Sequence, residues 1–203
     1  MSSDALVAVT PTHGEVPRNR RQEETFRKVL TAGVEMLRES SYADLTVRAV
    51  AKRAQVAPAT AYTYFSSKNH LIAEVYLDLI KQVPYFTDVN VPMPERVDNV
   101  LRALALVVAD EPEVAAACTT ALLSGNDPTV KTARDRIGTE IHHRVTSAIG
   151  PDADHRAVAA LEMSFFGALV QAGSGAFTYQ QIVNRLTYVV GLVLGEPPVL
   201  GEI

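Results

Sequence analysis

Hydroxyl and ammonium groups gather in one short stretch of the chain. The segment "PATAYTYFSSK", residues 58 to 68, contains Thr60, Tyr62, Thr63, Tyr64 and Lys68. Threonine and tyrosine hydroxyls donate hydrogen bonds to phosphate oxygens, and a lysine ammonium is a point charge for the same oxygens. A threonine can also hydrogen-bond a base edge or contact a thymine methyl. This stretch therefore has the chemistry to bind a polyanion such as a nucleic acid.

The charge of the chain is divided between its two ends. Residues 18 to 68 carry ten Lys/Arg against five Asp/Glu, whereas residues 82 to 203 carry eight against fourteen. The first segment is thus +5 and the second −6, in a chain of net charge −4. A basic segment on an acidic body points to a polyanion partner for one end only. An ordinary solvated surface would carry the same charges, so charge alone leaves both interpretations open.

Catalytic and metal-binding patterns are incomplete. Glu140 and His143 form one E-x-x-H on a predicted helix, but a di-iron bundle needs two such units and two further Glu residues. His142 and His143 are adjacent, so their side chains diverge on a helix and favour a solvent-facing interpretation. The sequence therefore predicts no enzyme activity, no metal and no cofactor.

Composition predicts a compact protein of a reducing compartment. Of 203 residues, 47% are hydrophobic and 21% charged, which is ordinary for a globular chain. The single Cys118 permits no internal disulfide, and the first residues lack the basic and apolar segments of a signal peptide. The longest apolar tract is interrupted by Glu162 and is shorter than the roughly 20 residues of a membrane span. We therefore expect a cytoplasmic location.

Apolar residues at helical spacing run through the chain and predict an all-α fold. Residues 1–20 are polar and aperiodic, which indicates a flexible arm. Helices are expected over 22–39, after Thr46, from Pro58, from Ser67 to Pro84, and at about 94–109, 112–124, 128–149, 154–173 and 178–195.

The second and third predicted helices are short and joined by a three-residue turn, residues 55–57, after a longer first helix. This order is the sequence form of a helix-turn-helix, whose second helix enters the DNA major groove with its outer face free. The outer face of that helix is predicted to consist of Ala59, Thr60, Thr63 and Tyr64, with Tyr62 at its border. We therefore predict base contacts from Ala59, Thr60 and Thr63, and phosphate contacts from Tyr62, Tyr64 and Lys68.

The segment "LTVRAVAKRAQVAPATAYTYFSSKNHLI" resembles the DNA-binding signature of tetracycline-repressor-like (TetR-family) regulators. It carries T-V-R-x-x-A-x-x-A followed by Y-x-Y-F-x-S-K, and "GVEMLRESSYADLTVRAVAKRAQV" matches the upstream half, so the resemblance covers about residues 21 to 83. It implies core positions at Ala51, Val56 and Phe65. It implies DNA contacts from Thr46, Arg48, Ala59, Thr60, Tyr62, Thr63, Tyr64 and Lys68.

Four positions depart from the family pattern. The family usually has Gly at Gln55, and a left-handed Gln there would cost on the order of 1–2 kcal/mol. It often has Gly at Ser41 as well. The usual Ser at Ala57 and the usual Leu at Ala61 are also missing, which affects the cap and the packing of the third helix.

For the rest of the chain, the resemblance implies a helix-turn-helix domain over 21–67 and a helical ligand-binding and dimerisation domain over 68–203, with 68–83 as the connecting helix. Small residues in the last two helices would let helices approach closely in a four-helix dimer interface, although a monomer core would also use them. These residues are Ala159, Ala160, Gly167, Ala168 and Gly191. A pocket for a largely apolar effector is expected at Cys118, Leu122, Met163 and Phe166, although such spacing is also typical of plain core.

The sequence thus predicts a ligand-responsive DNA-binding regulator that acts as a homodimer on a palindromic operator. We expect a repressor that a small apolar molecule releases. Two alternatives stay open at this point: a helical small-molecule-binding or protein-interaction module without DNA binding, and a metal-binding helical-bundle enzyme.

Overall fold

The computed structural model describes residues 18–124 and 127–195, and these residues form helices and turns without any strand. The all-α prediction is confirmed. Residues 1–17 of the predicted arm lie outside the described residues. The helices are α1 (Arg20–Glu39), α2 (Val47–Arg53), α3 (Pro58–Tyr64), α4 (Lys68–Gln82), α5 (Met93–Leu106), α6 (Pro112–Leu123), α7 (Pro128–Ile149), α8 (His155–Gly173) and α9 (Tyr179–Leu194).

Side-chain caps fix where the first helices begin. Asn19 forms a capping box with Gln22, so α1 begins at Arg20, two residues before the predicted start. Thr46 Oγ1 accepts a hydrogen bond from the Ala49 amide at 3.1 Å, as the sequence predicts for the start of α2. The third helix has no side-chain cap, because Ala57 stands at its N-cap position and offers no acceptor.

Gln55 adopts the left-handed conformation in the turn between α2 and α3. Its φ is 56°, and it is the one non-glycine residue with positive φ in the described part of the chain. The Val56 amide donates to the Ala51 carbonyl at 2.9 Å, which closes the turn. The turn therefore keeps the backbone path of a helix-turn-helix, and Gln55 is strained because its Cβ disfavours the left-handed conformation.

We expect Gln55→Gly to raise the free energy of unfolding by about 0.5–1 kcal/mol, because relief of the left-handed strain outweighs the added freedom of the unfolded chain. Urea unfolding of both proteins measures the difference. Lys52→Gly, in the last turn of α2, is the control and should instead lower stability by up to about 1 kcal/mol. A Gln55→Gly protein less stable than the wild type would contradict the strain argument.

A small aromatic core holds the first three helices together. The rings of Phe26 and Phe65 stack with centroids 5.0 Å apart, and Phe65 is fully buried. Ala61 and Ala51 are also fully buried, so an alanine suffices to pack the inner face of α3. Val56 is only half-buried against this core.

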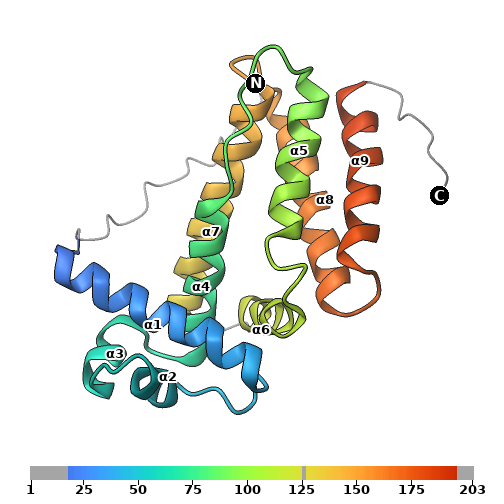
Figure 1. Ribbon diagram of the computed structural model, residues 1–203. Helices are drawn as coiled ribbons and strands as arrows, with labels where there is room; N and C mark the ends of the chain where they lie inside the picture. The colour runs from blue at the N-terminus through green and yellow to red at the C-terminus, as the bar shows by residue number, and fades with distance from the viewer. Residues whose placement is uncertain (1–17, 125–126, 196–203) are drawn as a thin grey trace, which may run out of the picture.

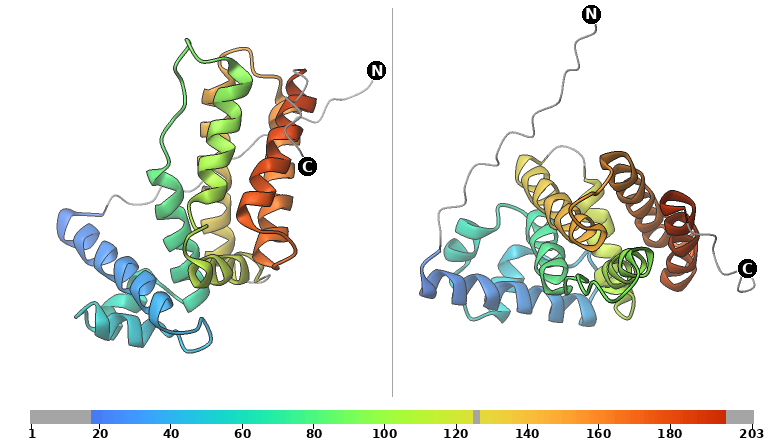
Figure 2. Two further views of the ribbon diagram at one scale, coloured as in Figure 1. Left: turned by 45° about the vertical axis from the view of Figure 1, so that its right-hand side comes forward. Right: turned by 90° about the horizontal axis from the view of Figure 1, so that it is seen from above.

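The first three helices gather at one end of the molecule, and the remaining helices form the body (Figure 1). Helix α4 touches α1 and also packs along α7 and against α6. Helices α5, α8 and α9 pack together on the other side of the body (Figure 2). Helix α4 is thus shared by both parts of the fold, as its broad apolar face predicts. No helix in the described residues is both long enough and apolar enough to cross a membrane.

Helices α4 and α7 run in parallel and are tied together by polar side chains. At the far end of α4, the buried Arg144 of α7 donates from Nε to the Val83 carbonyl and from Nη2 to the Lys81 carbonyl, each at 3.0 Å. Its Nη1 also pairs with Glu140 at 2.5 Å. Arg144 therefore satisfies carbonyls that the end of a helix leaves without partners. We call these two helices the α4–α7 pair.

Candidate nucleic-acid interface and candidate pocket

The outer face of α3 is open to solvent. Ala59, Thr60 and Thr63 are exposed, and half of the Tyr62 side chain is exposed. Thr63 donates its hydroxyl proton to the Ala59 carbonyl at 3.0 Å, so its oxygen is left as an acceptor and its methyl as an apolar contact. The structure thus places all four residues together on one accessible surface. This face has small and hydroxyl side chains, which permit close approach to base edges.

Tyr64 lies at the edge of the same surface. Its ring is half-buried and meets Phe26 edge-on at 6.0 Å, while its hydroxyl forms no hydrogen bond within the described residues. The apolar ring is therefore anchored in the core while the hydroxyl is left to bind another partner. This geometry suits a phosphate contact.

Thr46 and Arg48 extend this surface onto the start of α2. Both residues are exposed. Thr46 uses only its oxygen as an acceptor for the helix cap, so its hydroxyl proton is free to be donated. Arg48 has no ion-pair partner in the part of the chain that the structure describes. A cation beside an exposed helix start is well placed for a backbone phosphate.

Lys68 lies differently from the other predicted contacts. Its ammonium donates to the carbonyls of Tyr42 and Ala43 at 3.1 and 3.4 Å and lies 4.4 Å from the centre of the Tyr42 ring. This charge therefore fastens the turn between α1 and α2 to the start of α4. Lys68 nevertheless lines a shallow groove of about 270 Å³ together with Thr46 and Tyr62.

Some of the basic charge that the sequence shows is neutralised inside the fold. Arg53 pairs with Glu35 at 2.9 Å and with Glu39 at 2.5 Å, and these hydrogen bonds raise the pKa of Arg53. Arg38 pairs with Glu111 of the body. Counting charges along the sequence could not reveal these pairs, because the partners come from other helices. Both arginines fasten helices together and are not free for DNA.

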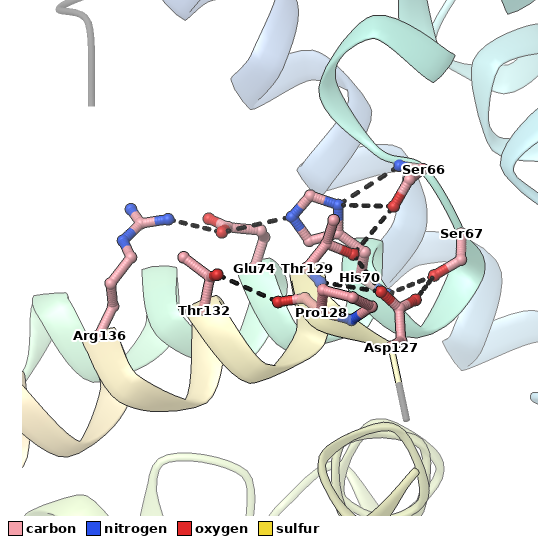
Figure 3. A network of polar contacts seen from close by, with 9 residues as sticks. All are labelled: Ser66, Ser67, His70, Glu74, Asp127, Pro128, Thr129, Thr132 and Arg136. Atoms are coloured by element: carbon pink, nitrogen blue, oxygen red, sulfur yellow. Dashed lines mark hydrogen bonds and ion pairs between the residues drawn. The ribbon is translucent and has the colours of Figure 1, made fainter. Parts of the chain in front are cut away.

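A polar network joins the turn before α4 to the start of α7 (Figure 3). Ser67 donates to Asp127 at 2.8 Å, and the Ser66 hydroxyl lies 2.9 Å from that of Thr129. Hydrogen bonds from Thr129 and Ser67 lower the pKa of Asp127 to about 2. A second contact follows about two turns later, where Arg136 binds Glu74 at 2.6 Å. The end of the helix-turn-helix segment is thus held directly by the body.

The pKa of Asp127 predicts how this junction responds to acid. Because the pKa is lower in the folded state than the ordinary value of 3.8, the stabilisation is complete above that value and is lost as the pH falls toward about 2. Asp127→Asn should therefore lower stability at pH 7 by about 1 kcal/mol or less, since the site is solvent-screened. The difference from the wild type should shrink as the pH falls through about 2. Thermal unfolding at several pH values measures it, and a difference that grows toward low pH would refute it.

A pocket of about 320 Å³ lies in the body between α4 and α6–α9. Three of the four predicted ligand residues line it, namely Cys118, Leu122 and Phe166. Met163 does not line this pocket, because 76% of it is exposed on the outside of α8. Burial raises the pKa of the Cys118 thiol to about 12, which makes the thiol an apolar wall rather than a reactive group.

The wall between α6 and α8 is closely packed at Gly173. A Cβ at this position would lie 2.1 Å from Thr119 Oγ1, so only glycine fits there without movement of α6 or α8. Thr119 in turn lines the pocket. The close contact therefore helps to fix the shape of the cavity.

Comparison with known proteins decides the family. The sequence model described as "Bacterial regulatory proteins, tetR family" matches residues 29–75, which run from α1 into α4. An HTH-type transcriptional regulator of Mycobacterium tuberculosis is 71% identical over 201 residues, which cover 96% of this chain and 94% of the relative. The chain belongs to the tetR family of bacterial regulatory proteins.

Solved structures show the same tetR-family fold. A TetR transcriptional regulator from Rhodococcus sp. RHA1 has a TM-score of 0.75 at 23% identity, over 90% of this chain and 100% of that one. Thermus thermophilus FadR, a TetR-family transcriptional repressor in complex with lauroyl-CoA, has a TM-score of 0.63 at 16% identity, over 87% of this chain and 100% of that one. The predicted family and its helical body are confirmed.

The last two helices of this tetR-family chain also carry large apolar side chains that are exposed. Met163 and Leu192 are 76% and 78% exposed, and Phe166 and Val170 are exposed by more than 40%. Large apolar side chains that gather on a surface mark interaction sites in soluble proteins. Helical spacing predicts Met163 in the pocket, but spacing alone does not say which side of α8 meets solvent.

Glu140 of the E-x-x-H unit and the neighbouring His142 have other partners in this tetR-family fold. Glu140 pairs with Arg144, and His142 lies 2.9 Å from Glu162 of α8. The described residues contain no group of three His, Cys, Asp or Glu side chains that could hold a metal ion. The Glu140–Arg144 pair lies within α7, and the His142–Glu162 contact links α7 to α8.

Proposed function

We propose that this chain is a ligand-responsive transcriptional repressor that binds a palindromic operator as a homodimer. The exposed face of α3 carries the proposal. It gathers Ala59, Thr60 and Thr63 for base edges, and it is flanked by hydroxyls and a cation for phosphates. The flanking residues are Thr46, Arg48, Tyr62, Tyr64 and Lys68. Lys68 contributes mainly by holding the turn, and secondarily by its charge.

We also propose that residues 21–67 form the DNA-reading domain and that 68–203 form the effector and dimerisation domain. A second copy of the chain would cover the apolar face of α8 and α9. Two-fold symmetry then presents two α3 helices to two half-sites. This symmetry supports a palindromic operator, and a DNA-binding regulator is expected to act in the cytoplasm, where its DNA lies.

The effector would bind in the pocket between α4 and α6–α9. The apolar lining of this pocket favours a largely apolar molecule. Thermus thermophilus FadR, which has the same fold, was solved in complex with lauroyl-CoA. The effector would release DNA if it binds more tightly to a second arrangement of the dimer. In that arrangement the α4–α7 pair would have moved the two DNA-reading domains, residues 21–67 of each copy, further apart. A preference of about 1–3 kcal/mol between the two states would weaken operator binding 5- to 150-fold.

Selection of bound sequences from random duplex DNA, at a stated salt concentration, tests the proposal. We expect enrichment of a palindrome whose half-sites are one helical turn or a multiple apart. If no sequence is enriched by a folded protein, the repressor proposal is wrong, and a helical ligand-binding module without DNA binding becomes the better description.

A further inference from the structure

The pocket is mostly apolar, yet two of its lining residues carry hydrogen-bond donors without a full set of partners. Arg134 of α7 donates from Nη1 to the Leu122 carbonyl at 3.1 Å. No carboxylate pairs with it in residues 18–124 and 127–195, since the acids near it on α7 and α4 pair with other cations. A guanidinium has five N–H donors, so most of those of Arg134 are left for a ligand.

Tyr76 of α4 is the second donor. The side chain is 3% exposed, and its hydroxyl oxygen is buried with no hydrogen-bond partner in the part of the chain described. A buried hydroxyl without a partner is uncommon and needs an explanation. Burial raises the pKa of Tyr76, so the hydroxyl keeps its proton and acts as a donor.

The two donors line the same pocket and lie at neighbouring levels along the α4–α7 pair. Contacts between the helices join residues 60, 62 and 61 positions apart, namely Ser67 with Asp127, Glu74 with Arg136 and Val83 with Arg144. Arg134 is therefore level with about residues 72–74 of α4, and Tyr76 follows about 3–6 Å further along the axis. One headgroup can thus be reached from both helices.

We propose that the effector is an amphipathic anion, whose apolar body contacts the pocket wall and whose acidic headgroup binds Arg134 and Tyr76. This rests on the proposed function and narrows its effector from apolar molecules in general to apolar acids. An uncompensated guanidinium beside an apolar cavity favours a ligand that brings the missing negative charge. The Tyr76 hydroxyl gains its partner from the same headgroup.

The test uses cis-parinaric acid, which fluoresces in apolar sites, and its methyl ester, which has the same body without the charge. We expect the acid to bind wild-type protein at least tenfold more tightly than the ester. Arg134→Met should weaken the acid at least about tenfold, and Tyr76→Phe about threefold or more, because hydrogen bonds to a charged group are lost. Neither variant should change ester binding by more than about twofold.

Arg134→Lys is the second variant, because it keeps the charge if Arg134→Met perturbs the fold. It should retain most of the preference for the acid. Arg156→Met, which removes an exposed arginine at the start of α8, is the matched control and should bind like the wild type. Equal binding of acid and ester by the wild type, or an unchanged preference in Arg134→Met, would overturn the proposal.

The same proteins separate this proposal from the repressor proposal. If the neutral ester releases operator DNA as well as the acid, the effector is not selected by charge, and the repressor function stands. If the protein binds the acid more tightly than the ester and Arg134→Met removes that difference, the acid-binding site is supported. If the same protein selects no DNA sequence, the repressor function is wrong.

Discussion

Thr60→Glu is expected to lower operator affinity by at least about a hundredfold while the fold stays intact. Thr60 is exposed in the middle of the proposed reading face of α3. A carboxylate there would face phosphates and base edges, and like charges brought together at an interface cost several kcal/mol. A hundredfold loss corresponds to about 2.7 kcal/mol. Fluorescence anisotropy with the selected operator at fixed salt measures the affinity.

Thr139→Glu makes the same chemical change on the exposed surface of α7 in the body. It alters net charge equally, so any general repulsion from DNA appears in both variants. Only the difference between them reports the α3 face. If both variants bind the operator alike, α3 does not read DNA. Circular dichroism and thermal unfolding should show both proteins folded like the wild type.

Arg144→Met should lower the free energy of unfolding by about 3–5 kcal/mol, the usual cost of removing one partner from a buried charged network. The side chain is 2% exposed and binds the carbonyls of Lys81 and Val83 as well as Glu140. Methionine fills similar space but supplies no donor. The end of α4 would therefore keep buried carbonyls without partners. Urea unfolding gives the difference.

Arg156→Met is again a suitable control, because Arg156 is almost fully exposed and pairs with Asp154 on the surface. It should change stability by less than about 0.5 kcal/mol. A loss of less than 1 kcal/mol in Arg144→Met would mean that the end of α4 does not depend on this guanidinium. Glu140→Gln tests how much of the loss belongs to the ion pair.

The helices could be predicted from the sequence because each has a local signal. Thr46 and Ser67 cap their helices with their own side chains, and Pro58 begins α3. The largest difference is at the end of α5, which stops at Leu106, because residues 107–110 turn instead of continuing the helix. The left-handed backbone at Gln55 could not be settled from the sequence, because glutamine itself does not require a positive φ and only the family's usual glycine at this position suggested one.

Contacts between distant residues could not be predicted in the same way. Lys68 has the right position in the motif for a phosphate, but its ammonium is held by carbonyls of a turn about 25 residues earlier. Arg134 carries no signal in the sequence, because a lone arginine on a helix is usually solvated. Met163 faces outward because the rotation of α8 depends on what packs against it, and one sequence does not contain that information.

The polar contacts between α4 and α7 also determine how these helices unfold locally. They occur near the first turn, the middle and the last turn of α4, through Asp127, Arg136 and Arg144. Neither helix can unfold locally without breaking contacts of the other. Backbone amides of α4 and α7 should therefore exchange with heavy water as one cooperative unit, and a ligand bound in the body should slow exchange in the turn that leads out of α3.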